Sequence, residues 1–369
     1  MTAAFTLAQP IYRGGRTFAE FGRAKALVRA GRAVLSGTEQ SVLLDAVAAY
    51  LDVVRDQQAV SYRQDNVSVL EDQLEAENSQ LLAGAITQTD TAQTESRLAL
   101  ARSGLAVAEG QLAASRARFE RAVGQPAVAL EDMPPLPELP GSMVEAINRG
   151  IASAPALIAA KENVVAANYA IDDAIGALLP TISLSLQYQY SKNAAVLGVI
   201  SPSVTQRGPA AFVQVTIPIY QGGFAQAQVR QSRHQQSQSL YNVTDIERQV
   251  RQAVSSTWGL LQAAQSAIIS DQAQVAASTT ALRGVIEEQR AGERTVLEIL
   301  NAQQELLIAQ LELANARHDA TVIGYQLLAS TGGLSAGSLG LDVKLYDPNE
   351  HFDRANSSFF SSWFSLRDD

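Results

Sequence analysis

An internal repeat at an offset of 208 residues constrains the fold of this chain more than any single motif does. The segment Pro10-Ile11-Tyr12-Arg13-Gly14-Gly15 returns 208 residues later as Pro218-Ile219-Tyr220-Gln221-Gly222-Gly223. Without a gap, the same offset relates five further pairs: Tyr50 and Trp258, Gly84 and Gly292, Thr87 and Thr295, Asp90 and Glu298, Gly124 and Gly332. The chain therefore contains two copies of one plan, a short strand followed by two long helical stretches.

Strict alternation of apolar and polar residues predicts the strands. In the segment 181–191 the apolar face consists of Ile182, Leu184, Leu186, Tyr188 and Tyr190. Its partner, 211–219, repeats the pattern with Val213, Val215, Ile217 and Ile219, and the first copy with Phe5, Leu7 and Ile11. Alternation over about ten residues is typical of a membrane β-barrel strand with its apolar face toward lipid. A soluble, half-buried strand has the same pattern.

The repeated Pro-x-Tyr-x-Gly-Gly segments predict turns from strand to helix. Proline is tolerated where a strand ends, and paired glycines allow the backbone to change direction. We expect these turns at Pro10, Tyr12, Gly14 and Gly15 and at Pro218, Tyr220, Gly222 and Gly223.

Two proline-free stretches, 16–82 and 224–290, have apolar residues three and four positions apart. Each predicts a helix of roughly 100 Å, a length that requires a coiled-coil context. We expect a second, antiparallel helix in each copy, over 86–123 and 294–331, after turns at Gly84 and Gly292. Thr87-x-x-Asp90 and Thr295-x-x-Glu298 have capping-box spacing at the start of these helices.

The predicted domains follow from the copies: a first repeat over 1–125, a proline-rich connector over 126–141, a second repeat over 142–333 and a C-terminal tail over 334–369. The core of the connector, Pro134-Pro135-Leu136-Pro137, cannot be helical. The tail ends in an aromatic cluster formed by Phe359, Phe360, Trp363 and Phe364.

Composition excludes several function classes. The net charge of −9 argues against a nucleic-acid partner, which requires clustered Lys and Arg. The absence of Cys excludes thiol chemistry, and no apolar run is long enough for a transmembrane helix. His234, His318 and His351 lack ligand spacing, and there is no phosphate-binding loop or nucleophile motif. We therefore expect no enzymatic activity, no metal and no cofactor.

Several of these motifs together resemble the TolC-like outer-membrane efflux family. They are Leu179-Pro180-Thr181 opening a strand, the two Pro-Ile-Tyr-x-Gly-Gly turns, Ala291-Gly292-x-Arg294-Thr295 and Leu313-Ala314-x-Ala316-Arg317. The resemblance covers residues 3–333. It implies a mainly α protein with a small β part, in which long antiparallel helical hairpins form an α-barrel tunnel joined to transmembrane β-barrel strands.

The same resemblance implies a homotrimer with a shared twelve-stranded barrel in outer-membrane lipid and a helical tunnel in the periplasm. A periplasmic adaptor protein and an inner-membrane efflux pump or ABC exporter would dock at the helical tips, at Gly84, Ala85, Gly292 and Glu293. Such a protein exports drugs, small molecules or proteins as a passive duct. The alternative that the sequence leaves open is a soluble periplasmic coiled-coil scaffold or adaptor.

One polar group near the tips is the candidate functional site: Thr89, Asp90, Arg294, Glu298 and Asn301. Arg294, Glu298 and Asn301 are four and three residues apart, so we expect them on one helix face. The resemblance implies that acids and hydrogen bonds between protomers close the periplasmic entrance here. Asn301 stands where a second acid often occurs. Capping of the helices is the simpler role for Asp90 and Glu298.

The first copy begins later than the second. Residues 142–210 precede the strand that matches residues 5–12, and their counterparts would fall before Met1. Residues 1–10 have no basic segment followed by an apolar one, so no signal peptide is predicted there. We expect the signal peptide and a fourth strand in the missing segment.

Overall fold

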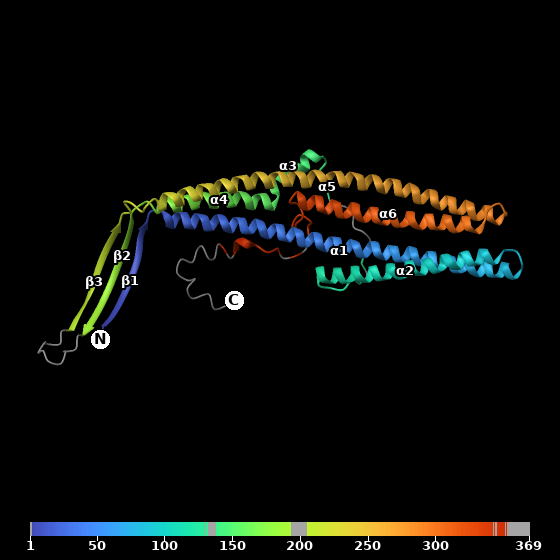
Figure 1. Ribbon diagram of the computed structural model, residues 1–369, viewed down its shortest axis with the longest axis horizontal. Coiled ribbons are helices and arrows are strands. Elements are labelled where there is room, and N and C mark those ends of the chain that lie inside the picture. Colours follow the sequence, from blue (N-terminus) through green and yellow to red (C-terminus); the bar gives the residue numbers. More distant parts are fainter. Residues whose placement is uncertain are drawn as a thin grey trace. The chain divides into compact units, whose positions relative to one another are not determined.

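The computed structural model describes residues 2–128, 130–131, 138–192, 205–341, 343, 345–350 and 352. The elements follow in the order β1 (Thr2–Arg13), α1 (Arg16–Leu82), α2 (Gln88–Val123), α3 (Met143–Ser153), α4 (Pro155–Gly176), β2 (Thr181–Lys192), β3 (Thr205–Thr216), α5 (Phe224–Arg290) and α6 (Val296–Ser330) (Figure 1). The chain is thus mainly helical with one small sheet.

Internal contacts divide the chain into two units, residues 1–35 with 155–248 and residues 36–154 with 249–369. Each unit takes part of both long helices, so the units cut across the predicted repeats 1–125 and 142–333. The predicted boundaries follow the sequence duplication and not the compact units, so the division into two repeats remains a prediction.

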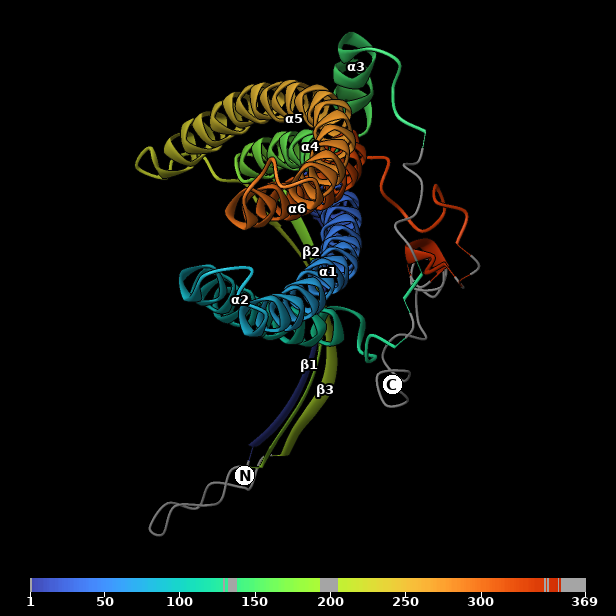
Figure 2. The same cartoon turned by 90° about the vertical axis from the view of Figure 1, so that its right-hand side faces the viewer.

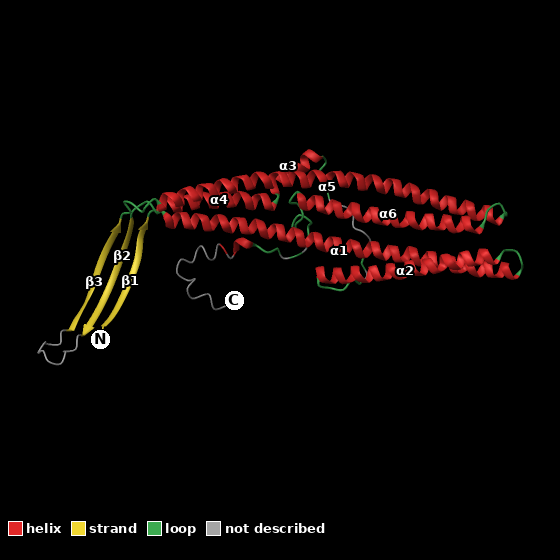
Figure 3. Ribbon diagram, viewed as in Figure 1, coloured by secondary structure: helices red, strands yellow, loops and turns green. Residues whose placement is uncertain are grey.

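The first unit contains an antiparallel sheet with the strand order β1-β2-β3 (Figure 3). Leu184 lies opposite Val213 and Leu186 opposite Leu7. Directly opposed residues share a face, so the predicted apolar residues of β2 lie on one face. Ser183, Ser185, Gln187 and Gln189 lie on the other.

A register shift in β1 corrects two predictions. Pro10 pairs with Ser183, but the next pair is Tyr12 with Ile182, so the strand has a bulge at Ile11. The extra residue reverses the alternation, and Tyr12 rather than Ile11 continues the apolar face. Pro10 was predicted to end the strand; it lies inside β1, beside the bulge, where the missing N–H is tolerated.

The third strand also ends earlier than predicted. The strand β3 stops at Thr216, so Ile217 and Ile219 lie outside it and are strongly exposed. Pro218 separates these two residues and has no N–H to donate to a ladder, which explains why pairing does not continue. Residues 193–204, predicted as a loop between β2 and β3, lie outside the described residues.

Both long helices have the predicted bounds. α1 and α5 contain 67 residues each and begin directly after their glycine pairs. The return helices α2 and α6 begin two residues later than predicted, because Thr87 and Thr295 are N-caps with extended backbone. No helix in the described part of the chain has an apolar stretch long enough to cross a membrane.

In the second unit, α2 runs back along α1, and α6 along α5 (Figures 1 and 2). Small and medium apolar side chains fill the seams: Ala49 and Val53 of α1 meet Leu112 and Phe119 of α2. Val254 and Leu261 of α5 pack with Leu327 of α6 and Ala146 of α3. The alanines in these seams allow close helix approach.

The described part of the tail also belongs to this core. Leu334 is fully buried and packs with Tyr325 and Leu328 of α6 and with Leu43 of α1. Sequence periodicity ends at this point and gave no sign of this packing. The predicted connector core 134–137, His351 and the aromatic cluster 359–364 lie outside the described residues.

Candidate functional site

The second hairpin turns at Gly292, whose φ of +83° is left-handed and favours glycine. Glu293 and Arg294 follow, both exposed, and Thr295 caps α6. The backbone N–H of Thr295 donates to Oε2 of Glu298 over 2.8 Å, and the Thr295 hydroxyl donates to the same oxygen over 3.0 Å. The predicted capping box is therefore present, and it fixes the Glu298 carboxylate at the tip.

Arg294 links both sides of this turn. Its Nε donates to Oε2 of Glu288 over 2.8 Å, and its Nη1 donates to Oε1 of Glu298 over 2.5 Å. Arg294 precedes the first residue of α6, so the expectation that it shares a helix face with Glu298 and Asn301 was wrong. It approaches Glu298 from the turn instead.

These bonds shift the protonation of the tip. The Thr295 N–H, together with Arg294 and the Thr295 hydroxyl, lowers the pKa of Glu298 to about 2. The carboxylates of Glu298 and Glu288 raise the pKa of Arg294 above its ordinary value. The second tip therefore carries fixed charges of both signs at neutral pH.

The first hairpin turns at Gly84, with a φ of +72°. Asp90 accepts the Thr87 N–H over 3.0 Å and the Thr87 hydroxyl over 2.8 Å. Thr89 and Ala85 are exposed beside it. At the offset of 208 residues the counterpart of Arg294 is Ile86, so this tip has the acid without its basic partner.

The two hairpins meet close to their tips. Leu98 of α2 packs with Val296 and Leu300 of α6 and with Leu70 of α1. Beside this cluster, Nη2 of Arg97 donates to Oδ1 of Asn301 over 3.0 Å. Asn301 is thus bonded to the first hairpin, whereas no hydrogen bond or ion pair among the described residues joins Asp90 directly to Glu298.

Sequence reasoning missed Arg97. It lies seven residues after Asp90, so both fall on the same face of α2 two turns apart. That spacing could have identified Arg97 as a residue of the tip. Its partner could not be predicted, because Asn301 is 204 residues away in sequence. Glu288, the second partner of Arg294, was missed because it precedes the glycine turn.

The strand-to-helix turns have the predicted backbone. Gly14 and Gly15 have φ values of +64° and +80°, and Gly222 and Gly223 have +61° and +81°. A Cβ on Gly14 would lie 2.3 Å from the Gly176 carbonyl oxygen, so this turn also needs glycine for space. Tyr12 lies within β1. Tyr220 and Pro218 lie beyond the end of β3, where Tyr220 is exposed and Pro218 is half-buried.

A charged cluster that the sequence did not predict lies deeper in the second unit. Asp52 of α1 lies 3.1 Å from Nη1 of Arg55, 3.3 Å from Arg118 of α2 and 3.1 Å from Nε2 of His318 of α6. His318 also contacts Asp319 over 2.8 Å. Within the described residues no group of three or more His, Cys, Asp or Glu has the arrangement to hold a metal ion.

Comparison with known proteins gives a consistent result. The family model described as outer membrane efflux protein matches residues 1–125 and 146–333. The outer membrane efflux protein BepC of Brucella suis is 36% identical over 368 residues, which cover 99% of this chain and 78% of BepC. The alkaline protease secretion protein AprF of Pseudomonas aeruginosa is 25% identical over 82% of this chain and 63% of AprF.

Solved structures share the fold. A crystal structure of CusC, described in terms of folding and transmembrane channel formation, superimposes with a TM-score of 0.79. The match covers 90% of this chain and 77% of CusC at 18% sequence identity.

Proposed function

We infer the function of this chain from the family to which it belongs, the outer membrane efflux proteins. It is an outer-membrane channel for efflux or secretion, and the resemblance that the sequence motifs predicted is confirmed. The alternative of a soluble periplasmic scaffold is not favoured, because the relatives include an outer membrane efflux protein and a protease secretion protein, and the structural neighbour CusC forms a transmembrane channel.

The observation that carries the membrane assignment is the exposed apolar face of the sheet. Phe5, Leu7, Tyr188, Val213 and Val215 share this face and are 48–70% exposed. An apolar surface of this kind requires a nonpolar cover, and lipid is the cover that fits a sheet whose opposite face is polar apart from Phe212. Gln187 and Gln214 would then face an aqueous lumen.

We place the chain in a homotrimer whose sheets form one shared barrel and whose hairpins form a tunnel in the periplasm. Pairing with further strands of the shared barrel would satisfy the free backbone groups at the edges of β1 and β3, because lipid offers no hydrogen-bond partners. Export through such a duct is passive, so an inner-membrane efflux pump or ABC exporter supplies the energy. Drugs, small molecules or proteins are the cargo.

The hairpin tips would serve as the gate and the docking site. Asp90 and Glu298 of three protomers would surround the entrance, with Arg294 restraining it through charge-assisted bonds. The exposed turn residues Gly84, Ala85, Gly292 and Glu293 would receive the periplasmic adaptor protein. Support comes from the fixed carboxylates at both tips.

The absence of Cys from the chain makes the membrane assignment directly testable. Single cysteines at Leu186 and Gln187 would each carry a nitroxide spin label in protein reconstituted into lipid vesicles. Because adjacent strand residues face opposite sides, we expect the label at 186 to be accessible to oxygen dissolved in lipid and the label at 187 to a water-soluble nickel complex. Equal accessibility of both labels to the nickel complex would contradict a lipid-facing sheet.

A further inference from the structure

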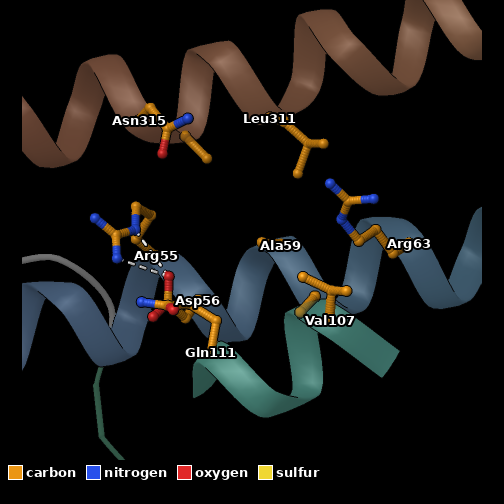
Figure 4. A pocket seen from close by; sticks show the side chains of 10 residues that line it. Arg55, Asp56, Ala59, Arg63, Val107, Gln111, Leu311 and Asn315 are labelled. Carbon is orange, nitrogen blue, oxygen red and sulfur yellow. Dashed lines mark hydrogen bonds and ion pairs between the residues drawn. The ribbon is translucent and has the colours of Figure 1, made fainter. Parts of the chain in front are cut away.

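A cavity of about 250 Å³ lies between three helices of the second unit, α1, α2 and α6 (Figure 4). On α1, Arg55, Ala59 and Arg63 are spaced four residues apart and share one helix face. Ala59 forms the floor because its side chain is small, and the two arginines rise on either side of it toward α6. The cavity is therefore bounded at both ends by guanidinium groups.

The two arginines differ in their partners. Arg55 is paired with Asp52 over 3.1 Å and with Asp56 over 2.8 Å, and Asp56 also accepts the Ser115 hydroxyl. Arg63 has no hydrogen bond or ion pair to any described residue. The five N–H donors of Arg63 are therefore free to bind a ligand, whereas some of the N–H donors of Arg55 are already paired with Asp52 and Asp56.

The position of Arg63 depends on a glycine in the middle of α2. A Cβ on Gly104 would lie 2.6 Å from Nη1 of Arg63, at the flexible end of that side chain, so a larger residue here would displace the guanidinium from its present position. Glycine inside a helix is less favourable than alanine, so its presence here calls for a local reason. A role in leaving room for the Arg63 guanidinium beside the cavity would explain why a glycine occurs at position 104.

The remaining walls determine which ligand fits. Gln111 of α2 and Asn315 of α6 offer amide groups, and neither side chain has a partner among the described residues. Val107 and Leu311 add apolar surface. Two arginines and one aspartate give the lining a net charge of +1, which a ligand with a single negative charge would balance. A doubly charged phosphate would be repelled by Asp56.

We propose that this cavity binds a small monocarboxylate with a short apolar chain, held at its carboxylate by Arg63 and along its chain by Ala59, Val107 and Leu311. The ligand would contact both helices of the first hairpin and α6 of the second. It would thus favour the spacing of the hairpins seen here, because a ligand stabilises the state that it binds. The site is separate from the tips and does not rest on the proposed transport function.

Isothermal titration of the full chain in detergent with butyrate tests the site, with butylammonium as the probe of equal chain length and opposite charge. We expect saturable binding of butyrate alone. Arg63→Gln should weaken it at least about tenfold, since a charge-assisted bond is lost. Gly104→Ala should weaken it as well, by displacing the guanidinium.

Matched controls separate this site from general charge effects. Arg102→Gln removes a positive charge from an exposed pair with Glu71, and Gly110→Ala fills open space on the same helix. Both variants should bind butyrate like the parent. Absence of saturable butyrate binding to the parent chain would overturn the proposal. So would equal binding of butylammonium or phosphate, or unchanged butyrate binding in a folded Arg63→Gln variant.

Discussion

Glu298 combines two tasks in one side chain. One carboxylate oxygen caps α6 through Thr295, and the other accepts a bond from Arg294. Both bonds favour the ionised form, so the carboxylate remains charged far into the acidic range. A residue that caps a helix can therefore also be a permanent negative charge at a pore entrance.

We expect Glu298 to contribute to acid sensitivity with a defined sign. Its pKa is about 2 in the folded chain against an ordinary value of 4.5, so the folded state binds fewer protons between these values. The stabilisation is complete above pH 4.5 and disappears as the pH falls toward 2. In denaturant unfolding at a series of pH values, the stability difference between parent and Glu298→Gln should shrink over this window. Glu293→Gln is the control, and a difference that stays constant to pH 2 would contradict the assignment.

Position 332 requires glycine for two reasons, its left-handed backbone and the lack of space for a Cβ. Its φ is +74°, and a Cβ would lie 2.4 Å from the Ser153 carbonyl oxygen. Gly124, at the end of α2, has a φ of +79° but open space around it. We expect Gly124→Ala to cost about 1–2 kcal/mol of unfolding free energy from the left-handed backbone, and Gly332→Ala distinctly more. Equal losses in denaturant unfolding would mean that the chain moves away from Ser153 without cost.

At the scale of elements, the sheet is defined by its two unlike faces. The bulge at Ile11 keeps Tyr12 on the apolar face at the point where β1 turns toward α1. Without that extra residue the remainder of the strand would present the opposite face, because side-chain orientation alternates at every residue.

Arginine substitutions compare the two faces directly. Leu184→Arg should cost roughly 2–4 kcal/mol in unfolding from lipid if the residue lies near the bilayer midplane. Gln187→Arg, three residues along the same strand, should be nearly neutral because its side chain would face water. Denaturant unfolding from lipid vesicles measures both. Equal tolerance of the two arginines would show that the faces are assigned wrongly.

At the scale of the whole molecule, we propose that the charges of the tips govern conduction in the trimer. Converging carboxylates raise the local concentration of cations in a narrow entrance. Arg294 opposes this effect in the second hairpin, whereas Ile86 in the first has no charge. The Arg97–Asn301 bond links α2 of the first hairpin to α6 of the second near the same place.

Planar-bilayer recordings can test this arrangement. Asp90→Asn combined with Glu298→Gln should lower cation selectivity, because the ring loses its negative charge. Arg294→Ser should raise single-channel conductance by releasing the turn. If both variants conduct like the parent and lose only about 1 kcal/mol of stability per cap, the residues serve capping alone.

What the sequence determined by itself is local in origin. The bounds of α1 and α5, the capping boxes at Thr87 and Thr295 and the left-handed glycines follow from propensities and hydrogen bonds within a few residues. The alternation in β2 predicted two faces for the same reason. The family could also be predicted, because its motifs are short and the helices that carry them repeat.

Only the tertiary structure decided which distant side chains meet. The bulge at Ile11 appears once β1 is paired with β2, and Leu334 is buried once the tail packs on α6 and α1. The Arg97–Asn301 bond and the cavity beside Arg63 bring together residues about two hundred positions apart or more. Periodicity specifies the face on which a residue lies, but the partner on that face depends on how far two long helices slide along each other, and this is set by packing over their whole length.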